Sequence, residues 1–260
     1  MSDEPEKAAA LMEAYVAANP RNADGQFTLA MAYEGIACNI KLTGDPASPA
    51  RIAHLEKAAD RYRSYLTLVR EVDDRSYRAT GLKSLARIYG RDALNQPPDA
   101  ERAARQLVDE DRTSSESYLV LAKVLRESDR HSEATELLRK ARFSLPSSEQ
   151  RPLAAGMWLH ATVSPKLPRA EIQALIDDLS AIADGWLAND PGNPTGPLAK
   201  RMAVELRANR LEDDPARKRA LLAEADLWRQ VSDARTAPEL ADVMEKLNQL
   251  RARSAASRRP

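Results

Sequence analysis

The sequence is poor in cysteine and in the residues from which strands and tight turns are built. Cys38 is the single cysteine in 260 residues, which excludes an intramolecular disulfide framework and any metal site with several cysteine ligands. Two phenylalanines and nine glycines leave little material for strands and hairpins. The composition therefore favours a helical protein. Because Cys38 falls on an apolar helical stretch, we expect it to be a small buried residue.

An excess of one charge sign and long apolar runs are also missing. The 39 basic and 39 acidic residues give a formal net charge of zero, whereas a dedicated nucleic-acid-binding protein usually carries a strong basic excess. No apolar run approaches the roughly 20 residues of a membrane-spanning helix. The N-terminus is acidic where a signal peptide is basic and then apolar. The sequence thus predicts a cytoplasmic protein without a membrane span, although a chain whose leader had been removed would look the same.

Motifs of catalysis and cofactor binding are not found. The sequence has no glycine-rich phosphate loop, no H-E-x-x-H pair and no G-x-S-x-G nucleophile elbow. Its three histidines are far apart in the chain. We expect His54 and His131 at the surface, and His160 on the concave side of the protein. A zinc site built from these three histidines without cysteine ligands is improbable. The prediction is therefore a protein that is not an enzyme and holds no metal and no cofactor.

Apolar residues recur at helical spacing between prolines. Proline lacks an N–H and its ring clashes inside a helix, and nearly all sixteen prolines lie between the periodic stretches. Ser48 and Asp214 each precede a proline, as N-cap residues commonly do. Twelve helices are predicted, at 4–19, 23–41, 49–72, 75–92, 98–110, 115–128, 131–144, 149–163, 168–189, 195–210, 215–232 and 238–255.

Residues 114–146 contain one complete helix–turn–helix unit. Ala122 and Ala134 lie where its helices cross, and small residues there allow an approach of about 8–10 Å. We expect Ala122 to tolerate added bulk less well than Ala103, which should lie nearer the surface. Pro146 ends the second helix. The apolar face of the first helix consists of Tyr118, Leu121, Ala122 and Leu125, and that of the second consists of Ala134, Leu138 and Ala141.

This order of residues resembles the tetratricopeptide repeat, a 34-residue unit of two antiparallel helices. The first-helix pattern recurs around Leu29 and around Leu85, and the resemblance covers about residues 8–146. It implies an all-α fold, a right-handed α-solenoid of antiparallel helix pairs. Residues 1–148 would form the repeats, with long inter-helix insertions. Residues 149–260 would form divergent helix pairs, a C-terminal capping helix and a basic tail.

The resemblance implies a non-enzymatic scaffold or adaptor that binds a partner in a concave groove. The first helix of each pair would line this groove. In the predicted helix 23–41, the residues that would face the groove are Phe27, Thr28, Met31 and Glu34. Guanidinium groups hold carboxylates bidentately, which predicts an acidic protein or peptide as the partner. The simpler alternative is that these cations only face water. The predicted partner-binding residues are Lys83, Arg87, Arg91, Leu119, Lys123 and Arg126, with Ser84 and Val120 beside them.

Two other functions stay open. An enzyme or enzyme subunit would use a pocket in the less repeat-like half, and polar groups from several helices would converge in that closed cavity. A self-assembling structural protein would instead stack its end repeats head to tail.

Overall fold

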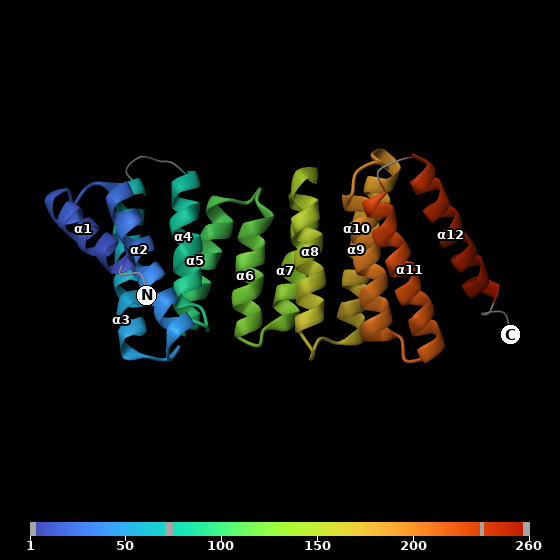
Figure 1. Cartoon of the computed structure of the whole chain (residues 1–260), viewed down its shortest axis with the longest axis horizontal. Coiled ribbons are helices and arrows are strands. Elements are labelled where there is room, and N and C mark those ends of the chain that lie inside the picture. Colours follow the sequence, from blue (N-terminus) through green and yellow to red (C-terminus); the bar gives the residue numbers. More distant parts are fainter. Residues whose placement is uncertain (1–3, 71–74, 235–236, 257–260) are drawn as a thin grey trace. The chain divides into compact units, whose positions relative to one another are not determined.

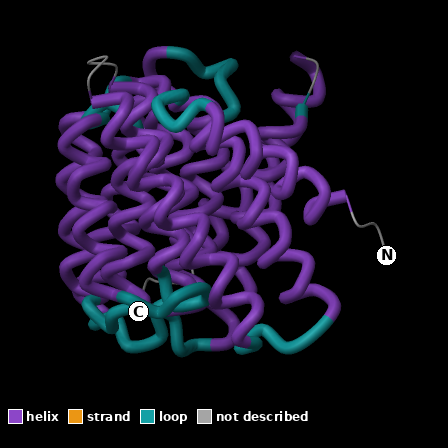
Figure 2. Tube along the Cα trace, turned by 90° about the vertical axis from the view of Figure 1, so that its left-hand side faces the viewer, coloured by secondary structure: helices purple, strands orange, loops and turns teal. Residues whose placement is uncertain are grey.

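The computed structural model describes residues 4–70, 75–234 and 237–256, and within these residues all regular secondary structure is helical. Figure 1 labels the helices, and Figure 2 shows the helices and the loops that connect them. A 3₁₀ turn, η1 (Ser147–Glu149), precedes α8, and a π turn, η2 (Arg207–Leu211), follows α10. The α-helices of the described residues are α1 (Glu4–Ala18), α2 (Ala23–Thr43), α3 (Pro49–Arg70), α4 (Arg75–Tyr89), α5 (Pro97–Glu110), α6 (Ser115–Glu127), α7 (His131–Ser144), α8 (Gln150–Val163), α9 (Arg169–Asn189), α10 (Thr195–Leu206), α11 (Pro215–Asp233) and α12 (Ala237–Ala256).

The all-α prediction is confirmed for the described residues, and each predicted helix end within them agrees with the structure within four residues. The end predicted at residue 72 lies outside the described residues. Both expected caps are present. Ser48 Oγ accepts from Arg51 N at 3.2 Å, and the Asp214 carboxylate accepts from Ala216 N at 2.8 Å. Each satisfies a backbone N–H of a first turn that has no partner within its helix. The end of the predicted basic tail, 257–260, lies outside the described residues.

The chain divides into two compact units. The first comprises residues 1–112 with 123–129, and the second comprises 113–122 with 130–260. Helix α6 therefore contributes its first turns to the second unit and its last turns to the first. The boundary between residues 148 and 149 was drawn where the repeat pattern becomes weak in the sequence, and it stays a prediction.

In the first unit, substantial contacts join each helix to the next one in the chain, from α1 to α5. Tyr62 and Tyr65 of α3 are buried, and the ring of Phe27 packs against both, with centroids 5.5 and 5.0 Å apart. Gly81 of α4 has a steric role, because a Cβ there would lie 2.7 Å from a methyl carbon of Leu66. The absence of a side chain at Gly81 lets α3 and α4 pack closely.

The second unit follows the same order of contacts. Each helix from α7 to α12 packs on its neighbour, and α8 also packs on α10. The largest fully buried side chains of this unit include Leu153, Met157 and Leu175. Trp228 and Val231 of α11 form a further apolar cluster with Val243 and Leu247 of α12. Helix α12 thus packs on α11 through this cluster, and its expected capping role stays a prediction.

The expected contrast between two alanines is wrong. Ala103 and Ala122 are both 3 % exposed. Ala103 was expected nearer the surface, but Ala100, Ala103, Ala104 and Leu107 form the buried face of α5, one helical stripe that packs in the core. Both alanines therefore lie at tight helix contacts.

Candidate functional site

Helices α2 and α4 and the last turns of α6 share one face of the first unit. The Arg87 guanidinium on α4 donates to both carboxylate oxygens of Glu34 on α2, at 2.8 and 2.9 Å. The backbone N–H of Arg91 donates to the Glu127 carboxylate on α6 at 3.3 Å. These contacts bring together segments that are 36 to 53 residues apart in the chain. We call this surface the α2–α4–α6 face.

On α2 this face presents exposed residues that recur every three or four positions. Met31 is 54 % exposed and Leu42 is 79 % exposed. Cys38 is also exposed, so its expected burial is wrong. The physical reason is that seven residues make two helical turns, which places Cys38 on the same side as Met31. We call this uncharged row the α2 stripe: Thr28, Met31, Gly35, Cys38 and Leu42.

Of the predicted cations, Lys83 and Arg87 lie on α4, and Arg91 lies in the turn after its end at Tyr89. Arg87 and Arg91 are exposed, whereas Lys83 is half-buried. Ser84, also expected on the groove, is buried in the core. Arg87 is held by Glu34, which also accepts from the buried Tyr62 hydroxyl at 2.7 Å. Burial, with the neighbouring Glu34 carboxylate, raises the pKa of Tyr62 well above its usual range, so Tyr62 remains a proton donor to Glu34.

The predicted residues of α6 fall in different units. Lys123 and Arg126 belong to the first, where Lys123 lies 3.5 Å from Glu127 in an ion pair. Arg126 is half-buried, and burial lowers the pKa of its guanidinium. Leu119 belongs to the second unit and is half-buried against Gly156 of α8, at a site with no room for a Cβ. Leu119 therefore has a clear packing role between α6 and α8.

All three histidines are more buried than predicted, and His160 and His131 meet polar groups of neighbouring elements. His160 of α8 is 1 % exposed. His131 is half-buried, with its Nδ1 3.1 Å from Ser164 Oγ. Thr135 donates to the carbonyl of His131, so His160 Nε2 donates to Thr135 Oγ1, at 2.9 Å. His160 Nδ1 lies 3.5 Å from Ser164 Oγ.

His54, expected at the surface, is half-buried in the first unit. Its ring lies 5.9 Å from that of Tyr33, centroid to centroid. Burial, and then the nearby Lys57 ammonium, lower the pKa of His54. Among the residues that the structure describes, no group of three His, Cys, Asp or Glu side chains is placed to hold a metal ion. Nor is any helix of the described chain long and apolar enough to cross a membrane.

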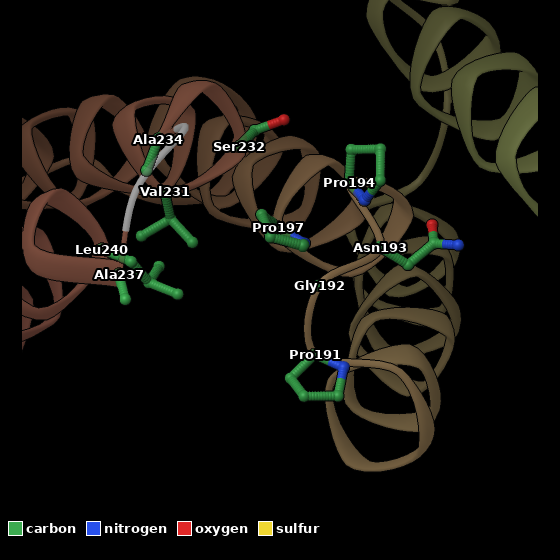
Figure 3. Close-up of a pocket in the computed structure, with 10 residues that line it drawn as sticks. All are labelled: Pro191, Gly192, Asn193, Pro194, Pro197, Val231, Ser232, Ala234, Ala237 and Leu240. Carbon is green, nitrogen blue, oxygen red and sulfur yellow. The ribbon is translucent and has the colours of Figure 1, made fainter.

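A pocket of about 350 Å³ lies in the second unit (Figure 3), beside the α9–α10 loop and between the end of α11 and the start of α12. Asn193 and Ser232 provide the polar side chains of its described lining, and the other residues are apolar or glycine. The converging polar groups that would favour an enzyme are not found in this lining. It consists of Pro191, Gly192, Asn193, Pro194, Pro197, Val231, Ser232, Ala234, Ala237 and Leu240.

No protein-family model matches the sequence, and comparison with curated proteins gives no match.

Proposed function

We propose that this protein is a non-enzymatic, cytoplasmic interaction scaffold of the tetratricopeptide-repeat type. Its helix pairs would stack as a right-handed α-solenoid and bind an acidic partner protein or peptide on the α2–α4–α6 face. The order of contacts supports the stacking, because within each unit the substantial contacts join helices that are adjacent or next-but-one in the chain. Stacked repeats have this property, since each repeat contacts only its neighbours.

The charge balance of the α2–α4–α6 face is the observation that carries the proposal. Three of the predicted cations, Arg87, Arg91 and Lys123, are exposed there. Glu34 contacts Arg87, and Glu127 contacts Lys123 and the backbone of Arg91. Because the positive groups outnumber the negative ones, a partner with carboxylates gains attraction that a neutral partner lacks.

The test is capture of partner proteins from the native cell with immobilised wild type and with an Arg91→Glu variant. Arg91 suits charge reversal because its backbone, and not its guanidinium, contacts Glu127. Reversal of Arg87 would instead set a carboxylate against Glu34. Arg151→Glu, at an exposed arginine of α8 in the second unit, is the matched control.

We expect Arg91→Glu to lose the captured partner and Arg151→Glu to retain it. Raised salt should weaken wild-type capture, because ions screen attraction between exposed charges. Equal capture by all three proteins would mean that the cations only face water.

A further inference from the structure

The carboxylate of Glu34 fills the position that a ligand carboxylate would take on Arg87. One terminal nitrogen of the Arg87 guanidinium, Nη2, donates to both Glu34 oxygens, at 2.9 and 2.8 Å. The Arg87 side chain is 61 % exposed, so a partner can reach it, whereas the Glu34 side chain is 18 % exposed. Since guanidinium groups hold carboxylates through paired bonds, Arg87 is already engaged by the kind of group that an acidic partner would bring.

Glu34 is held on its other side by the core of the first unit. Tyr62 is 1 % exposed, and its hydroxyl donates to Glu34 Oε2 at 2.7 Å. The carboxylate therefore bridges a buried hydroxyl and an exposed guanidinium. Its rotational freedom is already lost in the folded chain, whereas a partner carboxylate must still be ordered and desolvated to take its place. Exchange of Glu34 for a ligand carboxylate thus gains little.

The other exposed cations of this face are engaged differently. Lys123 lies 3.5 Å from Glu127, one turn further along the same helix, and exposed pairs of this kind contribute little. Arg91 contacts Glu127 through its backbone N–H. Arg87 differs from both, because its side chain is bonded to a carboxylate of another helix.

We propose that Glu34 is an internal competitor, which lowers the affinity of the α2–α4–α6 face for acidic partners by occupying Arg87. The apparent affinity of a site is reduced by the fraction of molecules in which the site is free, and Glu34 keeps that fraction small for Arg87. The proposal rests on the scaffold function above and specifies how the affinity of its binding face is set. An acidic partner then binds through Arg91 and Lys123, and it gains Arg87 only when Glu34 is displaced.

A Glu34→Gln variant tests the competition. Glutamine has the shape of glutamate and its carbonyl still accepts from Tyr62, but it has no charge with which to hold Arg87. The probe is a fluorescein-labelled hexaglutamate peptide, and fluorescence anisotropy with the full chain at low ionic strength measures its affinity. We expect Glu34→Gln to bind the peptide at least fivefold more tightly than wild type, because the freed guanidinium takes a peptide carboxylate.

Two further variants separate competition from a change of net charge. Asp92→Asn removes a negative charge in the turn after α4, where Asp92 is exposed and Arg87 pairs with Glu34 instead, so it should gain less than twofold. The double variant Glu34→Gln/Arg87→Gln has the net charge of wild type. It should bind the peptide within twofold of wild type, because Arg87 contributes nothing while Glu34 holds it. All three variants should retain the wild-type circular dichroism spectrum, since none changes the apolar core.

The proposal is overturned if Glu34→Gln gains less than fivefold, if Asp92→Asn gains as much, or if none of the proteins binds hexaglutamate. It is also overturned if the double variant binds more than twofold more weakly than wild type. Arg87 would then already contact the peptide in wild type, and Glu34 would only orient it.

The same measurements separate this proposal from the scaffold function. If Arg91→Glu loses the native partner while Glu34→Gln binds hexaglutamate like wild type, the scaffold function stands and the competition is wrong. If wild type captures no partner from the cell, the scaffold function fails, and the hexaglutamate affinities alone decide whether Glu34 competes for Arg87.

Discussion

The side chains with the clearest roles form contacts that span long stretches of sequence. The Glu34 carboxylate accepts hydrogen bonds from the Arg87 guanidinium, 53 residues away in the sequence, and from the Tyr62 hydroxyl. The sequence identified Arg87 as a surface cation but could not identify its partner, because helical spacing gives the side of a helix and not the neighbour that it meets. Cys38 and His160 were assigned to the wrong surroundings for the same reason.

His54 should make the stability of the first unit depend on pH. Its pKa is lowered from the ordinary value of 6.5 in the folded state, mainly by burial. As pH falls through this value, the unfolded chain binds a proton that the folded chain resists, so the free energy of unfolding falls. A His54→Gln variant removes this contribution. Between pH 7.5 and 5.5, its urea midpoint should fall less than that of wild type, and equal falls would contradict the burial of the ring.

Ala103 and Ala122 should be equally intolerant of bulk. Replacement of either by leucine adds three carbons to a closely packed site and should cost about 1–3 kcal/mol of unfolding free energy. Ala53 of α3 is exposed, so Ala53→Leu should change stability by no more than about 0.5 kcal/mol. Urea unfolding of the three variants measures the difference. If Ala103→Leu proved as stable as Ala53→Leu, the assigned packing of α5 would be wrong.

At the scale of the elements, prolines and helical periodicity predicted the helices closely, and the differences at their ends come from tertiary contacts. Helix α4 ends at Tyr89, three residues early, because its last carbonyls accept from the loop N–H groups of Leu94 and Gln96, at 2.9 and 2.8 Å. Helix α10 turns into a π turn at Arg207. The side chain of Arg210 in that turn donates to carbonyls at the end of α8. Neither contact has a local signal in the sequence.

The N-terminus of α6 depends on a carboxylate from another element. Glu149 Oε2 accepts from Ser115 N at 2.8 Å and from Ser115 Oγ at 2.6 Å, and these bonds lower the pKa of the Glu149 carboxyl. A Glu149→Gln variant loses the charge and should be less stable at pH 7 by about 1–2 kcal/mol. Because a lowered carboxyl pKa stabilises the fold only above that pKa, the difference should shrink in acid. Equal urea midpoints at pH 7 would show that the charge at this cap is unimportant.

At the scale of the molecule, the substantial contacts within each unit join helices that are adjacent or next-but-one in the chain, and the right-handed solenoid that the repeat resemblance implies stays a prediction. The resemblance also predicted five groove cations, and all five lie in the first unit, with Arg91 in the turn after α4. It did not predict that Glu34 and Glu127 would contact them, nor that Leu119 would pack against Gly156. The α2 stripe was only partly foreseen, through Thr28 and Met31, because the exposure of Cys38 and Leu42 depends on how α2 packs.

Head-to-tail assembly is the alternative that concerns the whole chain, and the described residues of α12 argue against it. The outer positions of this helix are mostly polar or charged, and Arg251 is bonded to Glu224 at 2.7 Å. A polar outer face on this helix disfavours the stacking of another copy on it. Light scattering over a hundredfold range of concentration should therefore give one constant mass, whereas open-ended growth would favour the structural alternative.

The most direct test of the binding account uses the single cysteine as a reporter within the α2 stripe. Cys38 is exposed, and no other residue of the 260 competes for a thiol reagent. The rate of its alkylation by iodoacetamide is measured on wild type, alone and with the captured partner at saturating concentration. We predict that the partner slows alkylation at least tenfold, because a partner bound on the α2–α4–α6 face covers the exposed Cys38. An unchanged rate with the partner bound would contradict the account, because the partner would then lie elsewhere on the protein.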